Sequence, residues 1–263
     1  MKTRRPRRRL KPIDSCTGNI ENNNKKINQK AQRRNVRNAY TEQIQRIVIG
    51  QLGGELDLRY HGEIMNDAIL TQICSLVQES YACLTFNFSG CSLLTESSMR
   101  YVTNHLGATL EKIEFTGTTL NPNVLKVLGS GLESLRVLKL SHCPNLLTRD
   151  LRDIFPSIFL TLTDLDVSYC PNLTDDALCW LAGSIGVGGD SQCRKLKSLN
   201  ISNCKNIGNR GIAALGKGCC ALQFLSIDGN PYVNSKGIVA LAGGCRSLRA
   251  LHLRDCSQVI YYF

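Results

Sequence analysis

The chain has 263 residues, 43% of them hydrophobic and 20% charged, which is the composition of a globular protein with a buried core. No apolar run approaches the roughly 18 residues of a membrane-spanning helix, and the N-terminus lacks the apolar stretch of a secretory signal, so we expect neither class. The net charge of +11 comes from residues 1–46, whereas the remaining 217 residues balance 18 basic against 18 acidic side chains. A neutral body disfavours a nucleic-acid-binding fold.

The N-terminal segment is basic and has no apolar periodicity over residues 1–34, which predicts a disordered tail. Its basic run favours two functions, a nuclear-import signal or a contact for acidic partners, and a solvated arm is the plain alternative. Any contact with nucleic acid is expected to be weak and to involve this tail. The residues of the candidate import signal are Arg4, Arg5, Arg7, Arg8, Arg9 and Lys11.

An amphipathic helix is predicted next, over residues 35–52. Its apolar positions step by four, four, three and one, which places them on one face of a helix. We expect it to cover the open end of the repeats that follow, as stacked repeats require a cap. The apolar residues are Val36, Tyr40, Ile44, Ile47 and Val48.

A leucine-rich pattern then recurs through residues 53–263. Its form is Leu135-x-x-Leu138-x-Leu140-x-x-Cys143, and eight copies end at positions 61, 91, 118, 143, 170, 204, 230 and 256. Two apolar positions spaced two apart predict a short strand with one buried side. The Cys or Asn that ends most copies is expected to be buried at the turn, where a thiol can donate weakly to a backbone carbonyl.

A short helix is predicted in the second half of each unit. In the fifth copy, Thr174 or Asp175 is a helix cap, and the spacing of Leu178 and Leu181 supplies the buried face. Glycines are expected to end three of these helices, at Gly183, Gly216 and Gly243. Strand and helix thus alternate in units of about 26 residues, which predicts an α/β solenoid.

These copies resemble the cysteine-containing leucine-rich repeats of F-box/leucine-rich-repeat proteins and of the antagonist-of-mitotic-exit type. Cys193, Cys219 and Cys245 match the optional first cysteine of that pattern. The resemblance implies a horseshoe of about eight repeats, with parallel strands on the concave face and helices on the convex face. It also implies a protein partner, no cofactor, and substrate recognition for ubiquitin ligation by a cullin complex.

No F-box is found in this sequence, and no proline lies between Pro12 and Pro122. The alternative is therefore an F-box-less scaffold or regulator that binds a cell-cycle signalling protein or a ciliary or cytoskeletal protein.

Catalysis is not expected from this chain. His142 and Cys143 are adjacent, but neighbouring residues at a strand end point to opposite sides, so a thiol–imidazole pair is disfavoured. The other histidines lack metal-ligand spacing. Most of the 13 cysteines are expected to be structural and reduced, which favours the cytoplasm or nucleus.

A binding surface is predicted instead on the concave face and its rim. Aromatic residues and arginine anchor interfaces most often, and the solvent-facing strand positions are the places that can present them. The predicted protein-binding residues are Tyr60, Lys139, His142, Asp166, Tyr169, Asn200, His252 and Arg254.

Two further segments depart from the repeat. Residues 183–192 form a glycine-rich insertion that follows a predicted helix and leads into a strand, which favours a surface loop over a phosphate-binding loop. The eighth copy has a strand and Cys256 but no helix after it. We therefore expect a truncated repeat array in which Tyr261, Tyr262 and Phe263 partly cover the last flank.

Overall fold

The computed structural model describes residues 54–80, 84–184 and 193–259, together with Glu42. The repeats lie in one compact unit, Val48–Phe263. Four predictions fall outside the described residues: the tail 1–34, the capping helix 35–52 apart from Glu42, most of the insertion, and the C-terminal aromatic cover.

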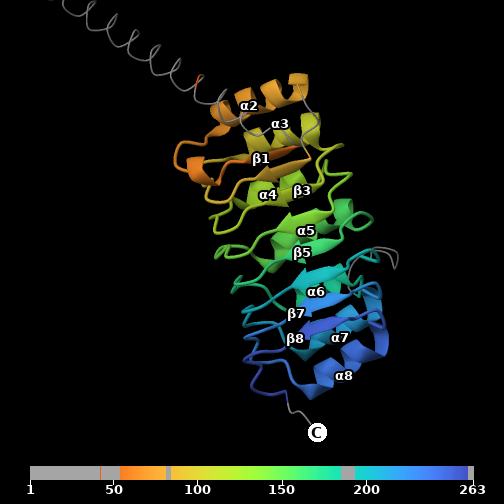
Figure 1. Cartoon of the computed structure of the whole chain (residues 1–263). Coiled ribbons are helices and arrows are strands. Elements are labelled where there is room, and N and C mark those ends of the chain that lie inside the picture. Colours follow the sequence, from red (N-terminus) through yellow and green to blue (C-terminus); the bar gives the residue numbers. More distant parts are fainter. Residues whose placement is uncertain (1–41, 43–53, 81–83, 185–192, 260–263) are drawn as a thin grey trace, which may run out of the picture. The chain divides into compact units, whose positions relative to one another are not determined.

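Eight three-residue strands form one parallel sheet in which the spatial order is the sequence order (Figure 1). Each repeat contributes one strand to this sheet, so the predicted leucine-rich-repeat solenoid is confirmed. The strands are β1 (Glu55–Asp57), β2 (Thr85–Asn87), β3 (Lys112–Glu114), β4 (Val137–Lys139), β5 (Asp164–Asp166), β6 (Ser198–Asn200), β7 (Phe224–Ser226) and β8 (Ala250–His252).

The helices all cover the same side of this sheet (Figure 1). A short 3-10 helix, η1, precedes the first of them. The described helical elements are η1 (Arg59–His61), α2 (Asp67–Ser80), α3 (Glu96–Leu106), α4 (Pro122–Leu128), α5 (Thr148–Ile158), α6 (Asp175–Leu181), α7 (Asn209–Gly218) and α8 (Ser235–Gly244). Within the described part of the chain, no helix is both long and apolar enough to span a membrane.

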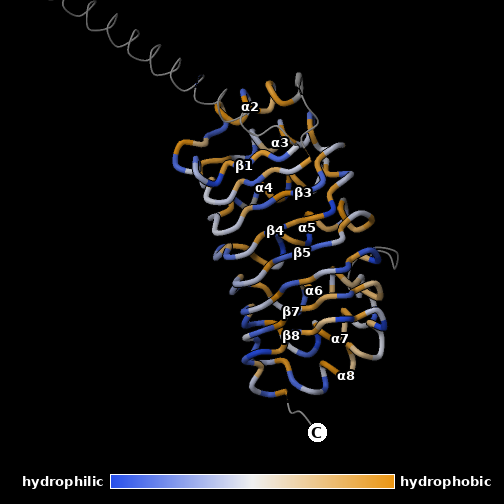
Figure 2. Tube along the Cα trace, in the orientation of Figure 1, coloured by the Kyte–Doolittle hydropathy of each residue, from blue (hydrophilic) through white to orange (hydrophobic). Residues whose placement is uncertain are grey.

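The register of the sheet aligns the same repeat position in every strand. The middle residue of each strand pairs with the middle residue of the next, as Leu138 does with Leu165 and Leu165 with Leu199. These middle residues are buried in β1 to β7, whereas most of the flanking residues stay partly exposed. Figure 2 shows the resulting alternation of apolar and polar residues across the sheet. A slip of one residue would expose this entire apolar row, so the pattern fixes the register.

The turn after each strand from β2 to β8 is closed by a side chain that forms a hydrogen bond with the preceding repeat. The Sγ of Cys143 donates to the carbonyl oxygen of Phe115 at 3.1 Å, and Cys170 donates to Leu140 at the same distance. Asn230 does the same through Nδ2, at 3.0 Å from the carbonyl oxygen of Ile201. The predicted role of this position as a buried donor is confirmed.

The helix of the fifth repeat agrees with its prediction. Thr174 is the N-cap of α6, and Leu178 and Leu181 are buried. The expected glycine stops are wrong for two helices, because Gly216 lies inside α7 and Gly243 inside α8. Gly216 is small for a packing reason, since a Cβ there would lie 2.6 Å from the carbonyl oxygen of Ala240 in the next helix.

Candidate protein-binding surface

The side of the sheet opposite the helices is called the sheet face, and it consists of the outward side chains of β1 to β8 and of the turns that follow them. The third residue of each strand lies in register with the same residue of its neighbours. This row has a charged or amide side chain on each strand from β1 to β6. Its members are Asp57, Asn87, Glu114, Lys139, Asp166, Asn200, Ser226 and His252.

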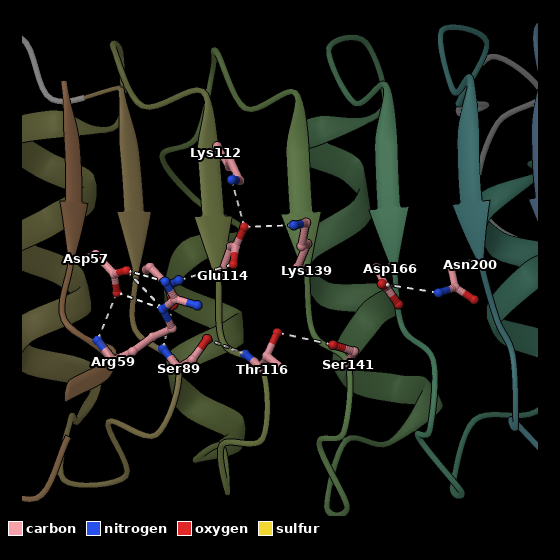
Figure 3. Close-up of polar contacts among 11 residues, drawn as sticks. Asp57, Arg59, Ser89, Lys112, Glu114, Thr116, Lys139, Ser141, Asp166 and Asn200 are labelled. Atoms are coloured by element: carbon pink, nitrogen blue, oxygen red, sulfur yellow. Dashed lines mark hydrogen bonds and ion pairs between the residues drawn. The ribbon is translucent and has the colours of Figure 1, made fainter. Parts of the chain in front are cut away.

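Glu114 is the centre of a polar network on β2, β3 and β4 (Figure 3). Its Oε1 lies 2.8 Å from the Nζ of Lys112 and 2.9 Å from the Nζ of Lys139. Its Oε2 accepts from Nδ2 of Asn87 at 3.2 Å. Burial raises the pKa of Glu114, but the bonds from Lys112 and Lys139 outweigh it and leave the pKa lowered. Lys139, a predicted binding residue, is thus engaged within the sheet.

Asp166 and Asn200, two more predicted binding residues, are brought together on adjacent strands. The Nδ2 of Asn200 donates to Oδ2 of Asp166 at 3.2 Å, as Figure 3 shows. Oδ1 of Asp166 accepts from the backbone N–H and the hydroxyl of Ser168, at 2.9 and 2.7 Å. Oδ1 of Asn200 accepts from the N–H of Ser202 at 3.1 Å. These side chains hold the chain where it leaves the strand, so their polar groups are largely satisfied from within.

His142 and Tyr169 occupy one turn position in successive repeats, directly before the buried cysteine. Both have a φ of 57°, in the left-handed region that favours glycine. Their rings stack, with centroids 4.2 Å apart and planes 10° apart. Both side chains are exposed, Tyr169 to 49%. The turns after the strands form one edge of the sheet face, which we call the turn edge. The aromatic pair His142 and Tyr169 projects from this edge.

Tyr60, His252 and Arg254 lie at the two ends of the sheet. Tyr60 in η1 is 85% exposed, and the guanidinium of Arg59 lies 5.7 Å from the centre of its ring. His252 packs edge-on against Phe224, with centroids 5.0 Å apart.

The remaining predicted residue, Arg254, is exposed, and its backbone N–H donates to Oδ1 of Asp228 at 2.7 Å. Seven strand spacings, about 33 Å, separate β1 from β8. The eight predicted residues therefore do not form one site.

The buried cysteines at the turns after the strands have a structural role. Burial raises the pKa of Cys143 to about 11 and that of Cys170 to about 12, so these thiols stay protonated. Cys143 is fully buried while His142 stacks on Tyr169 outside, which agrees with the predicted separation of the pair. Among the residues the structure describes, no group of three or more His, Cys, Asp or Glu is arranged to hold a metal ion.

Sequence reasoning missed the Glu114 network and the stacking of the two rings. A signal for the second was present in the alignment of the repeats. The position before the buried turn residue is Gly90, Gly117 and Gly229 in three copies, all with positive φ. Glycine at this position predicts a left-handed turn in every copy, and hence an unusual backbone for His142 and Tyr169.

The family model described as Leucine Rich repeat matches residues 192–216, which include β6 and most of α7. A search of curated proteins finds no match.

Two solved structures have a fold similar to that of this chain. One is the crystal structure of the Rad7 and Elc1 complex in yeast, at 14% identity and a TM-score of 0.43, covering 95% of this chain and 83% of that chain. The other is the TLR13–ssRNA13 complex, at 19% identity and a TM-score of 0.45, covering 73% of this chain and 24% of that chain. The strand register, the repeated turn contact and the match of residues 192–216 together show that the fold is a leucine-rich-repeat solenoid.

Proposed function

We propose that the chain binds a protein partner through the turn edge of its sheet face, with the stacked rings of His142 and Tyr169 as the anchor. The observation that carries this proposal is Tyr169 in a left-handed turn where three other repeats have glycine. A non-glycine residue in this conformation costs roughly 1–2 kcal/mol. His, Asn and Asp tolerate it better than Tyr, so Tyr169 is the exception. Because half of its side chain is exposed, the fold gains little in return.

The neighbouring polar groups support the same location. Asp166, Asn200 and Lys139 are engaged by other residues of the sheet, as their hydrogen bonds and ion pair show. A partner that approached them would have to break these bonds before it gained new ones. The exposed rings carry no such cost, and aromatic residues are typical of the few positions that supply most binding energy.

The test is affinity purification with the full chain as bait, followed by direct binding measurements with the purified partner. We expect Tyr169→Ala to weaken binding of that partner about tenfold or more. Tyr232→Ala is the matched control, because Tyr232 is 60% exposed but lies in the turn after β7 at a different repeat position. Equal binding by wild type and Tyr169→Ala would overturn the proposal.

The role we propose for this binding is substrate recognition for an SCF-type ubiquitin ligase and protein degradation, in the cytoplasm or nucleus. The resemblance of the cysteine-containing repeats to F-box/leucine-rich-repeat proteins supports it. The second candidate is an F-box-less scaffold or regulator of a cell-cycle signalling, ciliary or cytoskeletal protein, which the resemblance of the repeats to the antagonist-of-mitotic-exit type supports. Co-purification of a cullin and its adaptor with the full chain supports the first role. A partner recovered repeatedly without ligase subunits supports the second.

A further inference from the structure

The neutral charge of the repeats conceals a strong asymmetry along the array. Residues 54–184 contain 8 Lys/Arg against 15 Asp/Glu, whereas residues 193–259 contain 10 against 2. All ten basic side chains of the second range are exposed. The three C-terminal repeats are therefore a strongly positive surface joined to a negative one.

Six of these basic residues lie at the end of a helix or where the chain enters β6, β7 and β8. Five of them form the group that we call the basic edge: Lys195, Lys197, Lys217 in the last turn of α7, Arg246 and Arg249. Backbone bonds place two of them in one row. Gln223 donates to the carbonyl oxygen of Lys197 at 2.8 Å, and Arg249 donates to that of Gln223 at 2.8 Å. Lys197 and Arg249 are thus two strand spacings apart, about 10 Å.

The basic edge has no acidic partner among the residues that the structure describes. Within the described part of these repeats, Arg210 forms ion pairs with Asp175 and Asp176 on the helix side, away from the basic edge. The acid next to the row is Asp164 on β5, and its Oδ2 accepts from the hydroxyl of Thr163 at 2.6 Å. Like charges gathered on one edge repel each other, and an anionic ligand relieves that repulsion.

We propose that the basic edge binds an acidic segment of a protein in an extended conformation. In the extended polyproline II conformation a chain advances about 3.1 Å per residue with three residues per turn, so carboxylates three residues apart lie on one side, about 9 Å apart, close to the separation of Lys197 and Arg249. Arg246 and Arg249 can each take a carboxylate through two N–H groups. Single-stranded nucleic acid fits less well, because it stacks its bases on free aromatic rings, and Phe224, the aromatic residue that follows Gln223 in this row, is half-buried and already packs edge-on against His252. This site is separate from the sheet face and does not depend on the proposed function.

Cys220 provides a local probe of the basic edge in the full chain. It is the exposed member of the described cysteines, and it holds the position that Arg194 and Arg246 hold in the adjacent repeats. The experiment measures alkylation of Cys220 by iodoacetamide, resolved peptide by peptide by mass spectrometry, with increasing oligoglutamate. We expect saturable protection of Cys220 that weakens as salt is added.

The variant that tests the site is Lys197→Glu with Arg249→Glu. We expect it to need about tenfold more oligoglutamate for half-protection, each variant being compared with its own peptide-free rate. The matched control is Lys205→Glu with Lys236→Glu, which makes the same charge change within the three C-terminal repeats, but in the turn after β6 and at the start of α8 instead of at the basic edge. The basic N-terminal tail is present in every variant, so its own affinity for the peptide cancels.

The control is expected to keep the wild-type half-protection concentration. If both variants needed equally more oligoglutamate for half-protection of Cys220, the proposal would be overturned. The peptide would then be attracted by the overall positive charge of these repeats and not by the basic edge. Lack of protection in the wild type would also overturn the proposal. A single-stranded oligonucleotide that protects Cys220 at lower concentration than oligoglutamate does would assign the edge to nucleic acid instead.

Discussion

The ring of Tyr169 lies flat on the ring of His142, with centroids 4.2 Å apart. The contact follows from the repeat itself, because parallel units place equivalent turn residues about one strand spacing apart. The N–H of His142 donates to the carbonyl oxygen of Ser168 at 2.9 Å, which ties the two turns together. The pair is thus a rigid feature that two aromatic residues at one repeat position produce.

Two substitutions of Tyr169 separate the ring from the backbone strain beneath it. Tyr169→Gly and Tyr169→Ala both remove the ring, but only glycine adopts a φ of 57° without cost. We expect the Gly variant to be more stable than the Ala variant by about 1 kcal/mol, measured as free energy of unfolding in urea. Both variants are expected to lose partner binding equally. An Ala variant as stable as the Gly variant would show that the turn is unstrained.

The fold was predictable because eight copies carry the same information. Any one copy is ambiguous, such as the first, Leu56-x-Leu58-x-x-His61, but the common spacing predicts strand, turn and helix together. The buried donor role of Cys143 followed from the same repetition. The expected glycine stops at Gly216 and Gly243 are wrong because a local preference for glycine does not by itself end a helix, and α7 and α8 continue to Gly218 and Gly244.

The candidate surface was less predictable, because exposure in a strand pattern says nothing about cross-strand pairing. Lys139 was expected to face a partner, yet it pairs with Glu114 from the adjacent repeat. Asp166 and Asn200 bond each other across 34 positions of sequence. The net charge of the repeats hides their charge asymmetry for a different reason. In the sum over all repeats, the acidic excess of residues 54–184 cancels the basic excess of residues 193–259.

Asn230 replaces the buried cysteine of the turn in the seventh repeat, and the structure leaves one of its atoms unpaired. Its Nδ2 donates to Ile201, but its Oδ1 is buried with no partner. Asn230→Cys keeps a donor and removes the unpaired acceptor, so we expect a gain of about 1 kcal/mol in the free energy of unfolding. The reverse change, Cys204→Asn, is expected to destabilise by a similar amount. A loss of stability in Asn230→Cys would contradict this account.

The buried thiols predict a loss of stability at alkaline pH. Burial raises the pKa of Cys204 to about 11 and that of Cys170 to about 12, above the ordinary 9.0 of an exposed thiol. Above pH 9.0 the unfolded chain releases these protons while the folded chain keeps them. The free energy of unfolding therefore falls with rising pH from about 9 until the folded pKa is reached, by about 1.4 kcal/mol per pH unit for each thiol.

Urea denaturation at about pH 8 and about pH 10 measures this loss. Cys170→Ser removes one titrating thiol but keeps a hydroxyl donor. We expect this variant to lose about 1 kcal/mol less than the wild type between the two pH values. Lysines and tyrosines titrate in the same range in both proteins, so the difference isolates Cys170. Identical losses would mean that the thiol is not protected by burial.

Two glycines inside helices predict opposite effects of the same substitution. A Cβ at Gly216 would lie 2.6 Å from the carbonyl oxygen of Ala240, so Gly216→Ala forces α7 and α8 apart. We expect a loss of about 1–3 kcal/mol, the usual cost of overpacking. A Cβ at Gly243 meets nothing within 4 Å, so Gly243→Ala gains only helix propensity, about 0.5–1 kcal/mol. Urea midpoints that moved in the same direction for both variants would contradict the close approach of the two helices at Gly216.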